Sequence, residues 1–389
     1  MSELNDLITK LCPDGVPYKK LGDLCTIETG RLNANKAVDD GAYPFFTTAE
    51  KTSRINSYRW DTEALLIAGN ANVGSVKHYT GKFEAYQRTY VLTNFNQDIN
   101  VRFLFHFTRA FLKKYLANKS NSAAMTYIVL STLKNFEIPL PPLPVQEEVV
   151  RILDSFTELE TELETELSDR KEQYEYYRDY LLDKKNLERM DGKPVEMKKL
   201  GEVEEDGLIK LGRGNVISKR DIANNPGTYP IYSASVTNNG KFGEYGNYMF
   251  DDIRLTWSID GGGRFFYRDD EKYSVTNVCG WLKVLDENAF NPKFLFYVLT
   301  SQWSKLVFNY TVKAHPSVIR NIYDIPMVSL STQERIVDIL DRFDTLTTSL
   351  TDGIPAEIAM RREQYEYCRS RLLDFPRLPD GSASVSDGE

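Results

Sequence analysis

The sequence contains one long stretch twice, and this stretch decides the fold. The first copy reads IPLPPLPVQEEVVRILDSFTELETEL (138–163) followed by RKEQYEYYRDYLLD (170–183). The second copy reads IPMVSLSTQERIVDILDRFDTLTTSL (325–350) followed by RREQYEYCRSRLLD (361–374). The two copies are separated by 187 residues in their first parts and by 191 in their second parts, so the second copy contains four extra residues around Gly353.

Both copies have the periodicity of a long helix. Apolar side chains recur at alternating steps of three and four residues, which is typical of one apolar stripe along a helix. A helix of this length cannot bury such a stripe alone, so we expect the two copies to pack against each other as a helical spacer. Gly353 and Pro355 predict a bend or bulge in the second helix. The predicted seam residues are Val149, Ile152, Phe156, Leu159, Leu163, Ile336, Ile339, Phe343, Leu346 and Leu350.

Each helical copy follows a segment that opens with the motif Lys-Lys-Leu-Gly, at 19–22 and again at 198–201. Both segments combine short strands, rich in aromatic and β-branched residues, with one amphipathic helix, near 101–116 and 294–310. We therefore expect an internal duplication of an α+β domain. The predicted parts are a leader (1–15), a first globular domain (16–137), a first helical spacer (138–193), a second globular domain (194–324), a second helical spacer (325–375) and a flexible tail (376–389).

The acidic charge of the chain is unevenly distributed. The net charge is −8, but residues 16–137 carry +6 and residues 194–324 carry 0, whereas residues 138–193 and 325–389 carry −7 and −5. A polyanion responds to the local field of a surface, so the net charge does not exclude nucleic-acid binding by the globular segments. The four cysteines form no CxxC pair, and no apolar stretch is long enough to span a bilayer. These features predict a cytoplasmic protein without membrane contact.

No motif for catalysis is present in the sequence. It contains no GxxxxGK[ST] phosphate loop, no GxSxG elbow and no Asn/Asp-Pro-Pro-aromatic motif of base methyltransferases. The three histidines lie far apart, without Cys or carboxylate at metal-ligand spacing. His106 lies in a helical pattern and is expected to be packed rather than catalytic. The sequence therefore predicts no catalytic residue, metal site or cofactor in this chain.

Two motifs leave alternatives open. The run Gly261-Gly262-Gly263-Arg264 can form a turn between two strands, which we favour, or a phosphate cradle. The tyrosines at 174–180 and 365–367 can stack on bases, but aromatic side chains more often fill a helix seam or a partner interface, which we favour.

The polar and basic loops of the globular segments are the candidates for contact with DNA. Arg and Lys suit guanine edges and phosphates, and Asn and Gln suit adenine. The candidates are Arg31, Asn33, Lys36, Thr47, Thr48, Lys51, Arg54, Asn70, Asn72, Gln87 and Arg88 in the first segment, and Arg213, Lys219, Arg220, Ser233, Ser235, Asn238, Asn239, Arg264, Thr276, Asn277, Lys313 and His315 in the second.

The whole pattern resembles the specificity subunit of type I restriction–modification enzymes. The resemblance covers essentially the full chain and is strongest in the proline-rich lead-in (138–143), Gln146 and the Ile-Leu-Asp motif at 152–154. It implies two α+β target recognition domains, each of which reads one half of a bipartite site in double-stranded DNA. It also implies that the two long helices pack as an antiparallel coiled coil, set the spacing and dock two methyltransferase subunits.

The resemblance further implies that restriction subunits join the complex, and that S-adenosylmethionine, ATP and Mg belong to the partner subunits. The competing interpretation is an interaction protein whose coiled coil tethers two ligand-binding globules that do not touch DNA.

Overall fold

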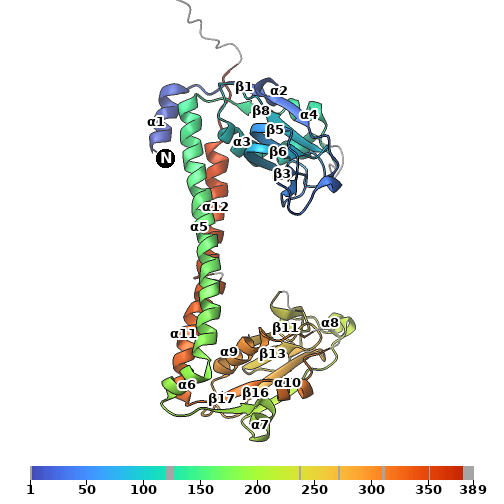
Figure 1. Cartoon of the computed structure of the whole chain (residues 1–389), viewed down its shortest axis with the longest axis vertical. Coiled ribbons are helices and arrows are strands. Elements are labelled where there is room, and N and C mark those ends of the chain that lie inside the picture. The colour runs from blue at the N-terminus through green and yellow to red at the C-terminus, as the bar shows by residue number, and fades with distance from the viewer. Residues whose placement is uncertain are drawn as a thin grey trace, which may run out of the picture. The chain divides into compact units, whose positions relative to one another are not determined.

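The structure is a computed structural model that describes residues 2–119, 127–235, 238–269, 272–308, 312–349 and 351–379. It forms two compact units, of which unit 1 comprises Met1–Leu163 and Ile358–Glu389, and unit 2 comprises Glu164–Glu357 (Figure 1). The boundary falls inside the longest helix, α5 (Leu143–Leu181), which therefore belongs to both units.

A search of the described residues finds no helix with the length and apolar character that a membrane span requires.

The domain of unit 1 is built on a mixed six-stranded sheet. All neighbouring strands are antiparallel except β3 and β6, which run parallel. Side chains alternate along a strand, so Leu65 and Ile67 face a core shared with helix α3 (Val101–Lys119), whereas Leu66 faces a second cluster with Phe46. The order in the sheet is β2 (Thr26–Thr29), β7 (Thr89–Thr93), β5 (Trp60–Ala68), β6 (Val76–Ala85), β3 (Tyr43–Phe46) and β4 (Ser53–Ile55).

Unit 2 distributes comparable strands over two sheets. Helix α9 (Pro292–Trp303) packs on strands β13 and β14 and shares their core. The first sheet has the order β10 (Ile209–Arg213), β16 (Cys279–Val284), β13 (Arg254–Ser258) and β14 (Phe265–Arg268), and the second has the order β12 (Lys241–Tyr245), β11 (Tyr229–Tyr232) and β15 (Ser274–Val275).

Shorter elements complete both units. The predicted strands and the helix predicted near 101–116 are present, whereas the helix predicted near 294–310 ends at Trp303. Unit 1 also contains α1 (Ser2–Leu11), α2 (Leu21–Leu24), the 3-10 helix η1 (Ala34–Lys36) and α4 (Leu130–Lys134). Unit 2 also contains α6 (Lys184–Asp191), α7 (Leu200–Glu205), α8 (Lys219–Asn224), η2 (Asn238–Gly240) and α10 (Pro316–Ile322).

The repeated Lys-Lys-Leu-Gly motif has a structural explanation. In unit 1, strand β1 (Tyr18–Lys20) pairs antiparallel with β8 (Glu137–Pro139), which leads into α5. In unit 2, β9 (Glu196–Lys199) pairs in the same way with β17 (Asp324–Met327), which leads into α11. Each two-stranded ribbon therefore ties the start of a domain to its end, just before the long helix.

The second predicted spacer is two helices rather than one bent helix. Helix α11 (Leu330–Thr348) ends where Ser349 takes an extended conformation, with ψ 129°, and α12 begins at Ile354 and ends at Leu372. Gly353 lies so close to the end of α11 that a Cβ atom on it would be 2.5 Å from the Thr345 carbonyl oxygen. The extra residues therefore form a tight connection in which position 353 accepts only glycine. The bend or bulge expected in the second helix is instead a complete interruption of that helix.

Helix α5 packs antiparallel against a different helix in each unit. In unit 1 it contacts α12, where Phe156 lies 6.2 Å from Tyr365 between ring centroids and Glu160 pairs with Arg362 at 2.5 Å. In unit 2 it contacts α11, where Tyr177 stacks on Phe343 at 5.5 Å. The predicted antiparallel coiled coil is therefore confirmed within each unit.

The phase of the predicted seam is wrong on α11. Ile336 is fully buried, but Ile339 and Leu346 are 39% and 37% exposed, whereas Leu340 and Thr347 are buried. The buried stripe continues one residue later because it faces both α5 and the unit 2 domain. On α5, Val149 and Leu163 are buried and the remaining predicted positions, Ile152, Phe156 and Leu159, are half-buried, as Phe343 is on α11. Leu350 and the tail after residue 379 lie outside the described residues.

A buried glutamine fixes each long helix to its domain. Gln146 is fully buried; its Oε1 accepts from the Asn100 amide at 2.8 Å, and its Nε2 donates to the carbonyls of Asp98 (2.9 Å) and Pro141 (2.7 Å). Its one side chain thus satisfies three backbone groups at the start of α3 and α5.

Gln333 makes the same set of bonds in unit 2. It accepts from the Asn291 amide at 2.9 Å and donates to the carbonyls of Ala289 (2.8 Å) and Val328 (3.0 Å). The glutamine common to both sequence copies therefore has the same structural role in both units.

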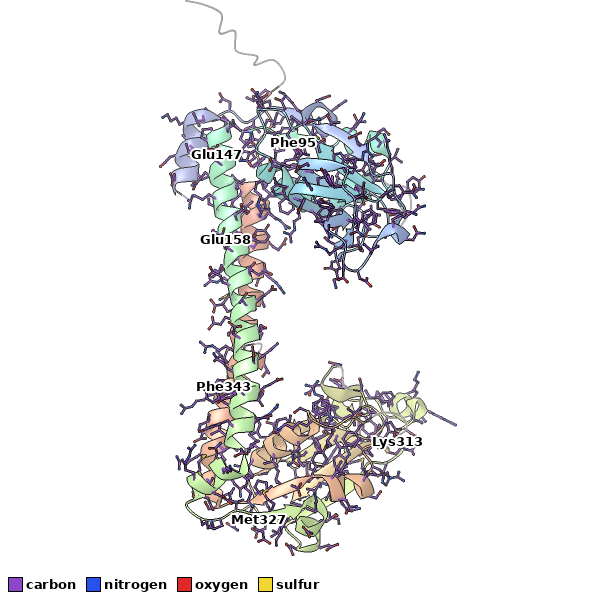
Figure 2. The ribbon with its side chains drawn as sticks, viewed as in Figure 1. Phe95, Glu147, Glu158, Lys313, Met327 and Phe343 are labelled. Carbon is purple, nitrogen blue, oxygen red and sulfur yellow. The ribbon has the colours of Figure 1, made fainter. Side chains whose placement is uncertain are left out.

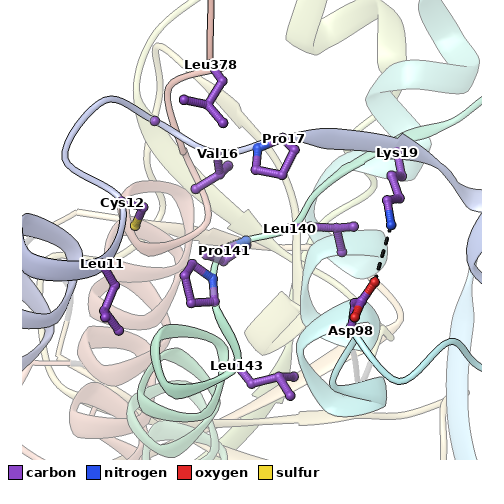
Figure 3. A pocket seen from close by; sticks show the side chains of 12 residues that line it. Leu11, Cys12, Val16, Pro17, Lys19, Asp98, Leu140, Pro141, Leu143 and Leu378 are labelled. Atoms are coloured by element: carbon purple, nitrogen blue, oxygen red, sulfur yellow. Dashed lines mark hydrogen bonds and ion pairs between the residues drawn. The ribbon is translucent and has the colours of Figure 1, made fainter. Parts of the chain in front are cut away.

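The two ends of the described chain meet in unit 1. The Val16 amide donates to the Pro376 carbonyl at 2.8 Å, and the Leu378 amide donates to the Val16 carbonyl at 3.1 Å. Figure 3 shows Leu378 beside Val16 above a pocket of about 370 Å³, with the Lys19–Asp98 ion pair (3.3 Å) at its edge. The N-terminal and C-terminal segments therefore complete the same core.

Replacing Gln146 with Leu should destabilise unit 1. The change leaves the Asn100 amide and two carbonyls without partners, at a cost of about 3 kcal/mol in the free energy of unfolding. Denaturant unfolding measures this cost, with Glu147→Gln at an exposed position of the same helix as the control. A Q146L protein as stable as the control would show that the glutamine does not hold the helix.

Leu340 and Leu346 provide a matched test of the corrected seam. Leu340→Asp places a charge at a fully buried position and should cost on the order of 3–5 kcal/mol, whereas Leu346→Asp should change the free energy of unfolding by less than about 1 kcal/mol. Thermal or denaturant unfolding of the two variants distinguishes them. A larger effect at Leu346 than at Leu340 would place the seam where the periodicity alone predicts it.

Candidate nucleic-acid interface

Four of the predicted loops in unit 1 come together at one end of the sheet. The Tyr86 amide donates to the Phe46 carbonyl at 2.9 Å, which joins the turn after β6 to the end of β3. The Gln87 amide donates to the Leu32 carbonyl at 3.0 Å, which adds the segment after β2. Asn72 joins the β5–β6 loop to the same surface, because its Nδ2 donates to the Thr48 carbonyl at 2.9 Å.

The loops of unit 2 converge in a corresponding way. Asn215 forms a parallel bridge with Thr276, and the Thr276 amide donates to the Tyr232 carbonyl at 2.9 Å. Ser258 joins the glycine-rich loop to this group, since its Oγ donates to the Ala234 carbonyl at 2.6 Å. The Ala314 amide donates to the Ile259 carbonyl at 3.1 Å and brings in the last predicted loop. Figure 2 shows Lys313, from this loop, on the side of the unit 2 domain away from α11.

The two surfaces share one construction although their sequences differ. In each unit the end of one strand, β3 or β11, runs parallel to a neighbouring strand, β6 or β15, which leads into a β-turn. In unit 1 the Thr89 amide closes this turn by donating to the Tyr86 carbonyl at 2.8 Å. In unit 2 the Cys279 amide closes it by donating to the Thr276 carbonyl at 2.9 Å. A glycine crosses this turn: a Cβ on Gly30 or Gly214 would lie 1.9 Å from the carbonyl oxygen just before the turn. Both glycines are therefore required for the close approach of two backbones.

Most of the predicted DNA-contacting side chains are accessible to solvent. In the described part of the chain, no ion pair is recorded for the exposed side chains of Arg31, Lys36, Lys51, Arg88, Arg213, Lys219, Arg220 and Arg264. The exposed polar candidates are Asn33, Asn72, Gln87, Ser235, Asn238 and Asn239, and the half-buried ones are Thr47, Thr48, Ser233 and Asn277. Exposed cations beside amides match the division of DNA contacts in which cations bind phosphates and amides bind base edges.

Several candidates already have structural partners. Arg54 donates to the carbonyls of Gly41 (2.6 Å) and Ala42 (3.1 Å), and Lys313 pairs with Asp260 at 3.0 Å. His315 caps α10, because its ring accepts from the Ser317 amide. These side chains hold loops in place.

Two further candidates are largely enclosed by the protein. Asn70 has a buried Oδ1 atom that lacks a hydrogen bond within the described residues. Thr276 is a wrong prediction, because it is only 5% exposed and its hydroxyl bonds to Ser233 at 2.8 Å. The parallel bridge with Asn215 buries it inside the turn, where a base cannot reach it.

One exposed aromatic side chain at the unit 1 surface was not predicted. Tyr127 is 57% exposed and forms an antiparallel bridge with Asn70. Tyr127 has no periodic pattern around it, so only the fold places it beside the predicted loops.

The structure places both motifs for which the sequence analysis left alternatives open. The glycine run is a hairpin turn between β13 and β14, as favoured: the Gly263 amide donates to the Ser258 carbonyl at 3.0 Å, and Trp303 Nε1 donates to the Gly262 carbonyl at 2.7 Å. Among the helix tyrosines, Tyr365 is buried and Tyr174 half-buried in the seam, whereas Tyr176, Tyr177, Tyr180 and Tyr367 are exposed.

A charged anchor holds the domain helix of unit 1 against α5. Asp154, the last residue of the Ile-Leu-Asp motif, accepts from Arg102 (2.8 Å) and from His106 Nε2 (2.8 Å) on α3. Burial of the carboxyl opposes its ionisation, but these two hydrogen bonds outweigh burial, and the pKa of Asp154 is lowered. His106 is completely buried, as expected for a packed side chain, and burial lowers its pKa to about 4.

Unit 2 has the same anchor with different partners. Asp341 accepts from Lys293 (2.7 Å) and from the Tyr297 hydroxyl (2.5 Å), both on α9. Burial, followed by the bond to Asp341, raises the pKa of Tyr297. The aspartate occupies the same place in both sequence copies. Its partners could not be predicted, because they lie on helices about 50 residues away in the sequence.

Comparison with known proteins identifies the duplicated architecture. The family of the type I restriction modification DNA specificity domain matches residues 13–173 and again residues 193–360. The chain belongs to this family. It is a specificity subunit, a non-catalytic DNA-recognition component of type I restriction–modification systems. The tethering protein that does not touch DNA is not supported.

Relatives of the specificity subunit come from Mycoplasma pneumoniae and Haemophilus influenzae. A putative type I specificity subunit from Mycoplasma pneumoniae is 34% identical over 260 residues, which cover 66% of this chain and 93% of that one. A putative type I restriction enzyme specificity subunit from Haemophilus influenzae is 30% identical over 391 residues and covers 92% and 96% of the two chains.

Solved structures share the fold of the specificity subunit. The S subunit of a type I restriction-modification system from M. genitalium has a TM-score of 0.58 at 15% identity, over 92% of this chain and 96% of that one. A chain from a study of complex assembly and conformational transition of the type I R-M system has a TM-score of 0.57 at 16% identity, over 94% and 98%.

The buried histidine should make unit 1 sensitive to acid. An unfolded histidine has a pKa near 6.5 and His106 one of about 4, so below pH 6.5 only the unfolded chain takes up the proton. This stability is complete above pH 6.5 and falls by about 3 kcal/mol as the pH reaches 4. Asp154 acts at lower pH, since its lowered pKa gives stability that is lost only below about pH 4.

The measurement compares wild type with His106→Gln by denaturant unfolding at several pH values. The glutamine keeps an N–H donor for Asp154 but does not titrate. The difference between the two proteins should shrink by about 3 kcal/mol between pH 7 and pH 4. Parallel pH profiles would show that His106 is not the titrating group.

Proposed function

We propose that this chain is the sequence-recognition subunit of a type I restriction–modification complex, and that each converged loop surface reads one half of a bipartite site in double-stranded DNA. The observation that carries the proposal is the shared construction of the two surfaces. In unit 1 the turn crossed by Gly30 carries Gln87 and the exposed Arg88. In unit 2 the turn crossed by Gly214 carries Asn277, and the exposed Arg213 precedes that glycine. Cations can contact phosphates while amides contact base edges, which is the division found in DNA-binding proteins.

The long helices are assigned two roles in the proposal. Helix α5 is continuous over 39 residues and belongs to both units, so we assign to it and to its partners α11 and α12 the spacing between the half-sites. We also propose that these helices dock two methyltransferase subunits, and that restriction subunits join through them. The docking is supported by large apolar and aromatic side chains left exposed on the helices: Tyr176 (63%), Tyr367 (62%), Met360 (49%), Ile339 (39%) and Leu346 (37%).

The chemistry of the complex is assigned to the partners. We propose that S-adenosylmethionine, ATP and Mg bind to the methyltransferase and restriction subunits and not to this chain. A search of the described residues finds no group of three or more His, Cys, Asp or Glu that could hold a metal ion. We also propose a cytoplasmic location, which the four unpaired cysteines support.

Selection from a random DNA pool, with the full chain in complex with its methyltransferase subunits, tests this function. We expect enrichment of two short motifs separated by an unread gap. Replacing residues 16–137 with the matching segment of a relative should change one motif and leave the other intact. Enrichment of no motif, or of one continuous motif, would contradict the proposal.

The same complex should bind DNA with a steep dependence on salt, because each cation on a phosphate releases counterions. Lys36→Ala and Arg88→Ala should each reduce the slope of log affinity against log salt by roughly 0.9. Lys171→Ala, at an exposed position on α5, is the matched control and should leave the slope unchanged.

A further inference from the structure

We infer that Gln87 reads an adenine in one half-site and that Asn33 is the positioning residue that fixes the orientation of its amide. The inference rests on the proposed function and deepens it by naming a base and the side chains that recognise it. It starts from one side-chain contact at the unit 1 surface: Gln87 Nε2 donates to Asn33 Oδ1 at 2.8 Å, and both side chains are exposed.

The backbone fixes both residues before any DNA is bound. Gln87 is the second residue of the turn closed by Thr89 N to Tyr86 O at 2.8 Å, and its own amide donates to the Leu32 carbonyl at 3.0 Å. Asn33 precedes the 3-10 helix η1 but its side chain does not cap that helix. Its Oδ1 is therefore available to Gln87.

The contact determines what Gln87 can offer to a ligand. A primary amide has one carbonyl oxygen and two N–H donors. Asn33 engages one of the two N–H groups. When this is the N–H trans to Oε1, the second N–H lies beside Oε1 and both are left for a ligand. An acceptor next to a donor matches the major-groove edge of adenine, where N6 donates and N7 accepts.

Asn33, in the orientation that accepts from Gln87, disfavours a flip of the Gln87 amide alone. A 180° flip of the Gln87 amide would place its Oε1 against the Oδ1 of Asn33, two acceptors without a hydrogen between them. Guanine presents two acceptors, N7 and O6, at the same edge, so the fixed Oε1 would face O6 without a hydrogen. The Gln87–Asn33 pair therefore favours adenine over guanine more strongly than a freely rotating glutamine amide would.

The charges around the pair fit this role. Arg88 follows Gln87 in the turn, and Arg31 lies two residues before Asn33; both are exposed and have no recorded ion pair in the described residues. Cations on either side of the amides can contact the phosphates that flank one base pair, which sets the depth at which the turn enters the groove.

The test is selection from a random DNA pool by the full chain in complex with its methyltransferase subunits. Gln87→Ala should lower the preference for adenine at one position of one half-site by roughly 5- to 150-fold, the range for one bidentate contact. Gln87→Arg should change the preferred base at that position from adenine to guanine, because arginine matches N7 and O6. The second half-site should remain unchanged in both variants.

Asn33→Ala tests whether Asn33 positions the Gln87 amide or only stabilises the fold. It should weaken the preference for adenine at the same position by a smaller factor than Gln87→Ala, because the amide can then rotate. Arg88→Ala is the matched control: it should lower affinity for all sequences alike and leave the preference unchanged. A change in base preference at one position is a readout that simple loss of stability does not produce.

The outcomes distinguish the inference from the proposed function. A wild-type complex that enriches two half-sites, with every position unchanged in Gln87→Ala and Gln87→Arg, overturns the inference alone. A shift at a position that does not prefer adenine in wild type also overturns it. A wild-type complex that enriches no bipartite motif overturns the proposed function and the inference with it.

Discussion

Each domain of this protein is held to its long helix by one buried glutamine, and the position of the candidate DNA-contacting loops depends on that bond set. Gln146 and Gln333 each satisfy three backbone groups where the domain helix and the long helix both begin. A carboxylate two turns further along, Asp154 or Asp341, adds a second point of attachment to the same domain helix. Two attachments along one helix prevent rotation of the domain about it, so a loop at the far end of the sheet has a defined place.

Both units keep these two attachments between domain and long helix, and they differ in the side chains of the loop surface on each domain. The glycine crossings at Gly30 and Gly214 and the turns at 86–89 and 276–279 are equivalent. The side chains presented by those turns are not, since Gln87 stands in one unit and Asn277 in the other. A backbone that is fixed by glycine and by main-chain bonds allows side chains at the tip to change at little cost to stability.

Much of this organisation could be predicted from the sequence because the same pattern occurs twice along the chain. The repeat, the Lys-Lys-Leu-Gly echo, the main strands and the domain helices all follow from local pattern. The loops that carry exposed Arg and Lys side chains were among those expected from the composition. The phase of α11 does not follow, because Leu340 faces both a helix and a domain, and periodicity cannot weigh two partners. The partners of Asp154 and the burial of Thr276 were equally hidden, since both depend on contacts between segments distant in the sequence.

The meeting of the chain ends in unit 1 has a consequence for biosynthesis. Unit 2 is one continuous segment, whereas the core of unit 1 needs Tyr365, Leu372 and Phe375 from the end of the chain. On the ribosome, the second half of the protein can therefore reach its native contacts before the first half, the reverse of the usual order. Until α12 emerges, the N-terminal domain exposes the apolar surface that this helix covers, so this domain is the part of the nascent chain most dependent on protection from aggregation.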